Sequence, residues 1–317
     1  MHARRRLKLV TKQGLTLIEV IVVIAVISVL TVLILSAVQS AREASRRLSC
    51  ASNLKQLGLA ISSYETLHKV YPQGTNGNMY SAQLMVLPFL EQTNLYSSFN
   101  FSAADMLGGF GRGKVNFTAG SAMLATFCCP SDPDSLTSPT TNYAWNGGLG
   151  NQDMLNDFVG TFSTKSTVKF RYIRTSDITD GLSHTVAAAE WKIGRIGSTD
   201  DSSIVFKIDA QQDERYELFV QRCQKATRQT AQFGAWKKNA FWSFGNYGET
   251  ILNFNSPPNS LSCFYPASLS LGEWPASSYH SSGVNTLFHD NHVNFTGTSV
   301  NPKTWHSLST KAGNDNL

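Results

Sequence analysis

The stretch Gln13-Gly14-Leu15-Thr16-Leu17-Ile18-Glu19 opens an apolar segment that continues to Leu35, and Glu19 is the one ionisable residue between Leu15 and Leu35. As an α-helix, these roughly 21 residues would span about 31 Å, close to the hydrocarbon thickness of a bilayer. The sequence therefore predicts a membrane-spanning helix over residues 15–35.

The residues before this helix are strongly basic. Arginines and lysines stand at five positions, Arg4, Arg5, Arg6, Lys8 and Lys12. The positive-inside rule then places residues 1–14 in the cytoplasm and the chain after residue 36 outside. Secretory signal peptides are cut after their apolar core at a small-x-small site, which the residues around 36–37 fit poorly. We therefore expect a leader of residues 1–14 and a single-pass anchor that stays in the cytoplasmic (inner) membrane.

Glu19 is costly inside a membrane. A carboxylate at the bilayer centre costs on the order of 3 kcal/mol, and less near the interface, where Glu19 would lie. Cleavage after Gly14 would free an amino group on Leu15, one helical turn from Glu19. The carboxylate would then neutralise this amine or the amine of a neighbouring subunit. The alternative is a plain anchor whose Glu19 reaches the interface.

These residues resemble a known signature. Gly14 to Glu19 is similar to the type IV prepilin motif, a glycine followed by Phe-Thr-Leu-Ile-Glu, with Leu15 in place of phenylalanine. The wider chain resembles a large bacterial family of pilin-like proteins called domain of unknown function 1559. The segments that carry this resemblance are Ala37–Arg47, Cys50–Ala60, Tyr71–Gly74, Leu87–Gln92, Cys129–Pro133, Thr179–Thr185, His280–Gly283 and Phe288–Asn291. The chain departs from the family at Ser36, where a proline is usual, and at Ser282 and Asn291, where glycines are usual.

The resemblance implies a function. It implies a prepilin-like structural subunit that is cleaved between Gly14 and Leu15, N-methylated on Leu15, and assembled through Glu19 into a type IV pilus-like or pseudopilus filament. The implied partners are a prepilin peptidase, a pilus or type II secretion assembly platform, and further copies of the chain. The rival interpretation is a monomeric membrane-tethered module that binds glycans or the envelope and uses the leader only for insertion.

The fold expected from the pattern and the resemblance is α+β and pilin-like. Apolar residues continue at three- and four-residue spacing as far as Leu67, and no proline intervenes before Pro72. This predicts one long helix over residues 15–69, with a membrane half and an amphipathic half that packs on a sheet. Residues 70–317 predict a mainly antiparallel, β-rich headpiece of one or two lobes, with short helices near residues 84–96. The apolar or aromatic runs that indicate its elements are Ser81–Leu90, Ala122–Cys129, Asn142–Trp145, Val168–Ile173, Thr185–Trp191, Ile204–Ile208, Glu217–Val220, Phe241–Phe244, Val284–Phe288 and Val293–Phe295.

The net charge does not point to nucleic acid. The chain has 27 basic and 22 acidic residues, but five of the basic residues lie in the leader, which has no acidic residue. The mature chain would therefore carry 27 − 5 = 22 basic and 22 acidic residues. A neutral chain has no electrostatic reason to bind phosphate, so we expect no nucleic-acid partner.

Five cysteines follow the membrane segment. In an oxidising compartment we expect Cys50 to pair with Cys129, or with its neighbour Cys128, and Cys223 to pair with Cys263. The first bridge would close a loop of about 80 residues and contribute about 4 kcal/mol in the chain-entropy model. The alternative, that these residues are buried thiols, stays open because sequence does not fix connectivity.

The C-terminal region is rich in histidine but predicts no metal site. Imidazoles and a carboxylate occur at His280, His289, Asp290, His292 and His306, and oxygen donors for calcium at Asp132, Asp134 and Asp290. Residues 289–292 are better explained as the turn of a β-hairpin, because Asp and Asn tolerate the positive φ of tight turns. We therefore expect neither a metal nor another cofactor.

We also expect no enzymatic activity. The chain has no Gly-x-Ser-x-Gly, His-Glu-x-x-His, phosphate-loop or dinucleotide-binding motif. His184 after Asp180-Gly181, with Glu190 nearby, is better explained by a turn that leads into a strand. Four tryptophans are candidates for a sugar-binding surface, but packing in the core and loops is the default expectation for them: Trp145, Trp236, Trp242 and Trp274.

Overall fold

The computed structural model describes residues 16–76, 78–102, 115–149, 172–195, 198–208, 216–229, 232–233, 238–265 and 268–313. The leader, Gly14 and Leu15 lie outside this part of the chain, so the predicted cleavage site is not described, and neither is most of the predicted run Val168–Ile173. The chain divides into two compact units, Met1–Ser45 and Arg46–Leu317.

Helix α1, Leu17–His68, is the first element and contributes to both units. In the first unit its apolar side chains are exposed along the whole run, for example Leu17 at 79% and Leu35 at 57%. Hydroxyl groups in this run donate to backbone carbonyls of the same helix, as Ser28 does to Ile24 at 2.8 Å and Thr31 to Ile27 at 2.7 Å. Self-contained hydrogen bonding of this kind is what a bilayer interior requires.

Among the described residues, α1 is long and apolar enough to cross a membrane, with a mean hydropathy of 3.1 in its most apolar window. Its length and composition are compatible with a membrane anchor or with a signal sequence.

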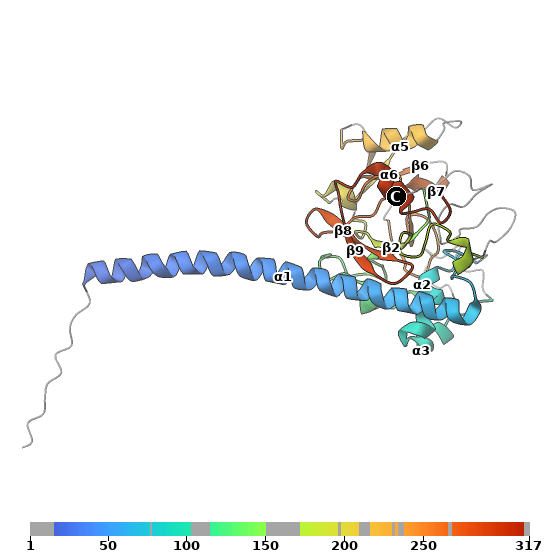
Figure 1. The fold of residues 1–317 in the computed structure, drawn as a ribbon, viewed down its shortest axis with the longest axis horizontal. Coiled ribbons are helices and arrows are strands. Elements are labelled where there is room, and N and C mark those ends of the chain that lie inside the picture. The colour runs from blue at the N-terminus through green and yellow to red at the C-terminus, as the bar shows by residue number, and fades with distance from the viewer. Residues whose placement is uncertain are drawn as a thin grey trace, which may run out of the picture. The chain divides into compact units, whose positions relative to one another are not determined.

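In the second unit, α1 is amphipathic. It buries one face and exposes the other, as the sequence predicted. The buried residues are Cys50, Leu54, Leu57, Gly58, Ala60 and Ile61. Figure 1 shows this light-blue part of α1 beside strands β8, Gly283–Phe288, and β9, Val293–Gly297.

Strands β8 and β9 belong to a five-stranded sheet of order β5-β1-β2-β8-β9. Its other strands are β1 Tyr143–Asn146, β2 Val186–Glu190 and β5 Ile251–Leu252. Residues that alternate along these strands divide between two buried clusters. Tyr143, Trp145 and Leu287 pack with the buried face of α1, whereas Ala144 and Val284 pack in a second cluster with Trp274 and Trp305. Both faces of the sheet are therefore covered.

A second sheet has the order β4-β3-β6-β7. Its strands are β3 Val205–Lys207, β4 Gln232–Phe233, β6 Ser262–Tyr265 and β7 Ser268–Glu273. The long helix on a sheet confirms the α+β class. The described strands form two sheets, and most of their pairs are antiparallel, as expected. Both sheets are nevertheless mixed, because β1 pairs with β5 in parallel, and so does β3 with β6. Parallel neighbours need a long connection, so sequence spacing alone did not reveal them.

The shorter helices match the sequence prediction near residues 84–96 and differ from it at residues 217–220. The helices predicted near residues 84–96 are present as α2 Ala82–Met85, η1 Leu87–Leu90 and α3 Thr93–Ser97. The run Glu217–Val220, placed among candidate strands, lies instead in helix α5 Tyr216–Gln224, whose buried Phe219, Val220 and Cys223 recur at helical spacing.

Two further runs are not strands. Ala122–Cys129 contains the 3-10 helix η3 Ala125–Phe127, and Phe241–Phe244 forms a turn. Further short helices in the described residues are α4 Phe117–Gly120, η4 Thr175–Asp177, η5 Asp201–Ser203 and α6 Pro302–Ser307.

Candidate functional site

The first described turn of α1 holds Glu19 in a reciprocal cap. The carboxylate Oε2 accepts hydrogen bonds from the backbone N of Thr16 at 2.7 Å and from its Oγ1 at 2.8 Å. The Thr16 hydroxyl accepts in return from the backbone N of Glu19 at 3.4 Å. This is the capping-box arrangement, which satisfies two of the donors that a helix N-terminus leaves unpaired. Glu19 thus has a partner within its own helix.

The part of α1 in the second unit presents a second feature, an exposed apolar face. Leu48 is 72% exposed and Leu59 is 52% exposed. The two lie eleven residues apart, about three helical turns, and point away from the buried face that includes Leu54 and Leu57. The packed headpiece therefore leaves room for another apolar surface on α1.

Two disulfides fix helices to the headpiece. Cys50 of α1 is bonded to Cys129, which follows η3, and Cys223 of α5 is bonded to Cys263 of β6. These are the pairs the sequence favoured among the possibilities it left open. Cys128, the other candidate partner for Cys50, is a buried thiol whose pKa is raised by burial.

Polar contacts add to the first disulfide. Asn53 Nδ2 donates to the carbonyl of Cys128 at 2.8 Å, and Lys55 Nζ donates to the carbonyl of Asn291 at 2.6 Å. The guanidinium of Arg47 lies 3.6 Å from the ring centre of Phe295. The disulfide and polar contacts such as these thus hold the outer part of α1 to the headpiece.

A buried polar cluster of Glu190, His280 and Asn285 lies next to the Cys50–Cys129 disulfide. Glu190, at the end of β2, accepts from the backbone N and from Nδ2 of Asn285, both at 2.8 Å. Nε2 of His280 lies 3.5 Å from Oε1 of Glu190 and 3.7 Å from Sγ of Cys129. Glu190 and His280 are only 2% and 3% exposed, so this pair is shielded from solvent.

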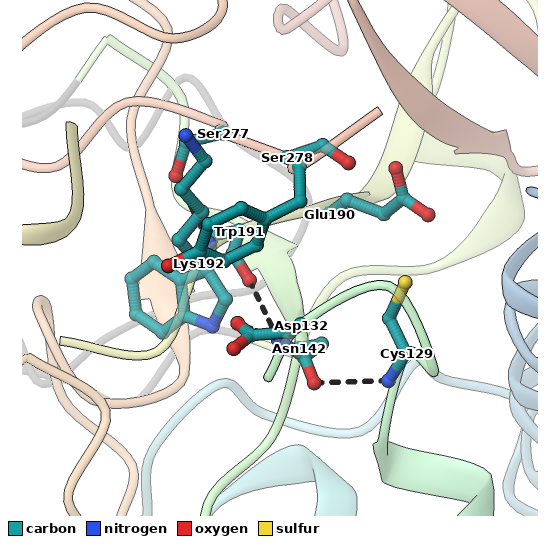
Figure 2. A pocket seen from close by; sticks show the side chains of 9 residues that line it. Cys129, Asp132, Asn142, Glu190, Trp191, Lys192, Ser277 and Ser278 are labelled. Carbon is teal, nitrogen blue, oxygen red and sulfur yellow. Dashed lines mark hydrogen bonds between the residues drawn. The ribbon is translucent and has the colours of Figure 1, made fainter. Parts of the chain in front are cut away.

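A small pocket adjoins this cluster. It has about 10 Å³ of room for the centre of a water molecule, close to the least that one ordered water needs. Figure 2 shows Cys129 and Glu190 on one side of the pocket, with the sulfur and the carboxylate in the same region. The lining residues are Cys129, Asp132, Asn142, Glu190, Trp191, Lys192, Ser277, Ser278 and Tyr279. A pocket of this volume has no room for a sugar or a peptide.

Asp132 has a structural role on the far side of the pocket. Its Oδ2 accepts from Asn142 Nδ2 at 2.7 Å and from the backbone N of Ile193 at 2.9 Å, and its Oδ1 accepts from the backbone N of Asp134 at 3.0 Å. Burial raises the pKa of Asp132, and these hydrogen bonds oppose that rise. Asp132 thus ties together three segments of the headpiece.

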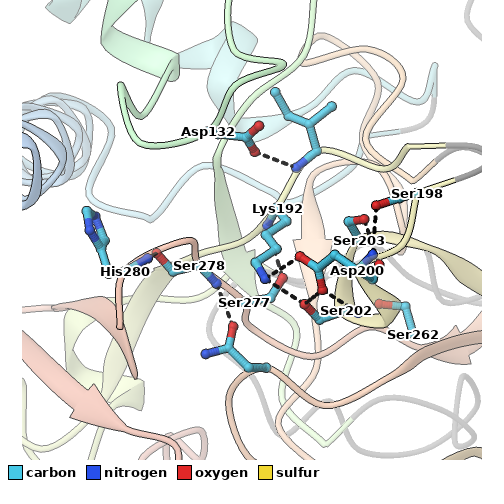
Figure 3. Close-up of polar contacts among 12 residues, drawn as sticks. Asp132, Lys192, Ser198, Asp200, Ser202, Ser203, Ser262, Ser277, Ser278 and His280 are labelled. Carbon is cyan, nitrogen blue, oxygen red and sulfur yellow. Dashed lines mark hydrogen bonds and ion pairs between the residues drawn. The ribbon is translucent and has the colours of Figure 1, made fainter. Parts of the chain in front are cut away.

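Two buried lysines, Lys192 and Lys238, both donate hydrogen bonds to Ser202 of η5. Lys192 Nζ donates to Asp200 Oδ2 and to Ser202 Oγ, both at 2.7 Å (Figure 3). Lys238 Nζ donates to the carbonyl of Ser202 at 2.9 Å and to Ser262 Oγ at 3.2 Å. Burial, together with the nearby charge of Lys192, lowers the pKa of Lys238 to about 7.

The candidate histidines separate in the fold. His289 is buried against the ring of Tyr71 at 4.7 Å, and burial lowers its pKa to about 3. His292 bonds to Asp290 at 2.6 Å within the turn, and His306 lies 3.0 Å from the carbonyl of Asn255. The predicted hairpin is confirmed, since β8 and β9 pair around residues 289–292 and Asn291 has φ of 71°.

The residues considered for catalysis do not meet. His184 lies in the exposed turn before β2, where its Nδ1 is 3.4 Å from the Oγ of Ser183. Glu190 pairs with His280 and not with His184. Trp145, Trp242 and Trp274 are fully buried in the core, and Trp236 lies outside the described residues.

Sequence reasoning missed the Glu190–His280 pair. The two residues are 90 positions apart, and no local pattern links them. One signal was present, a carboxylate that ends the otherwise apolar run from Val186 to Ala189. A charge in a buried strand needs a partner, but the sequence does not say which residue supplies it.

Comparison with known proteins gives a family match over most of the chain. The model of a family described as "Protein of unknown function (DUF1559)" matches residues 39–303. No curated protein and no solved structure matches the chain.

Proposed function

The chain belongs to the family described as protein of unknown function (DUF1559), and we propose that it is a prepilin-like structural subunit. The proposal has the chain cut after Gly14, anchored in the cytoplasmic membrane through the first part of α1, and assembled into a type IV pilus-like or pseudopilus filament. The observation that carries it is the apolar helix that follows this glycine in the sequence, has a carboxylate near its start and exposes its apolar side chains from Leu17 to Leu35.

The membrane part of the proposal rests on composition and burial. Exposed Val, Ile and Leu side chains from Leu17 to Leu35 would be unfavourable in water and favourable in lipid. The basic residues before Gly14 support a cytoplasmic leader and an extracytoplasmic headpiece. Disulfides such as Cys50–Cys129 fit an oxidising compartment outside the cytoplasm.

The assembly part rests on Glu19. A prepilin peptidase would free the amino group of Leu15 next to the residues that Glu19 caps. A positive amine and a carboxylate in lipid attract strongly, because each is costly there without a partner. A new subunit entering from the membrane would therefore be docked by its amine against the Glu19 of a neighbour, with a pilus or type II secretion platform driving its extraction.

A second function is favoured by one observation. Because Glu19 is already satisfied by Thr16 in the same helix, the chain does not need a neighbour to tolerate this carboxylate. The chain would then be a monomeric membrane-tethered module for glycans or the envelope. In that case Glu19 acts only as a helix cap.

A matched pair of variants separates the two functions. Thr16→Val removes the hydroxyl of the cap and keeps the carboxylate, whereas Glu19→Ala removes the carboxylate and keeps the hydroxyl. In the filament proposal both variants are still cleaved, yet only Glu19→Ala reduces the amount of chain in the sheared surface fraction, by at least about tenfold. Equal effects of the two variants would support the cap alone.

The processing step has its own measurement. Mass spectrometry of the membrane-extracted chain is expected to give a mature N-terminus at Leu15, with a mass increase of one methyl group where the amine is methylated. A Gly14→Val variant should accumulate with its leader intact. An N-terminus at Met1 in the native chain would rule out the proposal and leave the tethered module.

A further inference from the structure

The strongest unassigned feature of the headpiece is the group Cys50, Cys129, Glu190 and His280. One ligand atom from each residue lies within 4.8 Å of the other three, and all four residues are buried. They come from α1, the loop after η3, the end of β2 and the loop before β8. Two sulfurs, one imidazole nitrogen and one carboxylate oxygen are a donor set suited to a tetrahedral zinc-class ion.

We propose that these four residues form a redox-gated metal site. When the cysteines are joined, the disulfide holds α1 to the headpiece and the sulfurs are poor ligands. When the disulfide is reduced, the two thiolates, Nε2 of His280 and a Glu190 oxygen bind one zinc-class divalent cation, and the metal links α1 to the headpiece in place of the S–S bond. This proposal does not depend on filament assembly.

The distances fit this exchange. In a tetrahedral zinc site with Zn–S near 2.3 Å and Zn–N near 2.0 Å, ligand atoms lie roughly 3.3–3.8 Å apart. Nε2 of His280 is already 3.7 Å from Sγ of Cys129 and 3.5 Å from Oε1 of Glu190. Once the S–S bond is broken, the main adjustment is therefore a separation of the two sulfurs to the spacing of tetrahedral ligands.

Outer contacts already orient the ligands. Nδ1 of His280 lies 3.5 Å from the Oγ of Ser131, which leaves Nε2 facing the cluster. Asn285 holds both oxygens of Glu190 at 2.8 Å, and Asn142 Oδ1 accepts from the backbone N of Cys129 at 2.9 Å. Partners of this kind fix ring and carboxylate orientation in metal sites, where their loss costs 10–100-fold in affinity.

The two chemical steps balance. A dithiol reductant gives two electrons to the Cys50–Cys129 bond, its own sulfurs join in a disulfide, and its two protons pass to the cysteine sulfurs. Binding of Zn²⁺ then releases both protons to solvent as the thiolates bond to the metal. The reductant would be a thiol–disulfide oxidoreductase or a small dithiol.

This site departs from the expectation of no metal, which was based on the interpretation of residues 289–292 as a hairpin turn. Cys50 and His280 are 230 residues apart and meet only in the folded headpiece. The other histidines of the C-terminal region do not take part, since His289 packs on Tyr71 and His292 on Asp290.

The test uses the full chain in detergent with Cys223→Ser and Cys263→Ser, so that the second bridge supplies no thiols. The chain is reduced with a phosphine and titrated with Zn²⁺ against a chromophoric chelator, and Co²⁺ serves as a spectroscopic probe. The reduced chain is expected to bind one Zn²⁺ and to give the charge-transfer bands of a tetrahedral cobalt thiolate, whereas the oxidised chain binds none. Absence of stoichiometric binding by the reduced chain would overturn the proposal without any ligand variant.

Ligand variants then identify the donors. His280→Ala and Glu190→Gln should each weaken Zn²⁺ binding by more than about 100-fold, because even outer-shell losses cost 10–100-fold. Cys128→Ser, next to the proposed ligand Cys129, should leave the affinity unchanged. Mass mapping of the Cys50–Cys129 bridge in each oxidised variant checks the fold. Unchanged affinity in both ligand variants would mean that free thiols alone hold the metal, and the proposed site would be wrong.

Discussion

Gly58 is the residue of α1 at which a side chain has no room. A Cβ at this position would lie 2.7 Å from Oδ1 of Asn291 and 2.8 Å from Cδ1 of Leu287. In an exposed helix, replacing glycine by alanine stabilises by about 1 kcal/mol. Here we expect Gly58→Ala to destabilise the headpiece by about 1–3 kcal/mol, because overpacking outweighs helix propensity. Denaturant unfolding followed by tryptophan fluorescence measures this change.

Leu59→Ala is the matched control, one position along and on the exposed face. It should change the free energy of unfolding by less than about 0.5 kcal/mol. A Gly58→Ala chain more stable than the native one would mean that α1 does not pack on the β8–β9 hairpin as described.

Glu273 gives the headpiece a pH dependence. It is fully buried, and burial raises its pKa from 4.5 to about 7, although hydrogen bonds from Ser256, Asn255 and Tyr216 oppose this. Since the folded-state pKa lies above the unfolded value, the folded chain binds more protons between pH 4.5 and 7, and stability falls as the pH rises through this window. Glu273→Gln should therefore stabilise by up to about 3 kcal/mol at pH 8 and by little at pH 4.

Unfolding curves at pH 4 and pH 8 measure this difference. Glu91→Gln, at an exposed carboxylate, serves as the control and should change stability little at either pH. A Glu273→Gln chain with the same pH dependence as the native chain would contradict a protonated, buried Glu273.

At the scale of elements, the Cys50–Cys129 disulfide fixes the outer part of α1. It joins residues 79 positions apart, and closing a loop of that length contributes about 4 kcal/mol in the chain-entropy model. We expect Cys50→Ser with Cys129→Ser to increase amide hydrogen exchange in residues 46–68 more than in β2 or β8. Exchange measured by mass spectrometry on the full chain in detergent tests this.

The second disulfide is the control for that experiment. Cys223→Ser with Cys263→Ser should increase exchange in α5 and leave residues 46–68 close to native. A uniform rise over the whole headpiece in both double variants would show that neither bridge acts locally and that the unit unfolds as a whole.

Elements with a strong local signal could be predicted from the sequence. The 3.6-residue period identified α1, and two alternating runs around an Asp-Asn turn identified the β8–β9 hairpin. Helix α5 was mistaken because a window of four residues cannot separate a helix from a strand. The parallel pairs β1–β5 and β3–β6 were missed because nothing local marks a partner so distant along the chain.

The candidate site residues also divide into those that a local sequence signal marks and those that it does not. Glu19 was selected as a candidate because a lone carboxylate in an apolar run is conspicuous, and its role in assembly stays a prediction. For the cysteines, the sequence favoured a small set of pairs, Cys50 with Cys129 or Cys128 and Cys223 with Cys263. The Glu190–His280 pair could not be predicted, because β2 and the loop before β8 are brought together only by sheet pairing.

At the scale of the whole molecule, charge and apolar surface support the same interpretation. Removing the leader would leave 22 basic and 22 acidic residues, so neighbouring headpieces would not repel one another through net charge. In the proposed filament, apolar helix surface would then add to the attraction between the Leu15 amine and Glu19. The described chain offers such surface along the apolar run of α1 from Leu17 to Leu35 and, in the second unit, around Leu48 and Leu59.

This surface gives a last prediction about assembly. A single cysteine in place of Leu48 or Leu59 should form cross-links between chains in cells, because helix bundling in a filament would bring the exposed face of α1 close to its copies. Thr137→Cys, at an exposed loop position, is the control and should cross-link weakly. Cross-linked ladders of many subunits on gels support a filament, and they should disappear in the Glu19→Ala background. Equal, weak cross-linking at all three positions would contradict bundling through α1 and favour a tethered monomer.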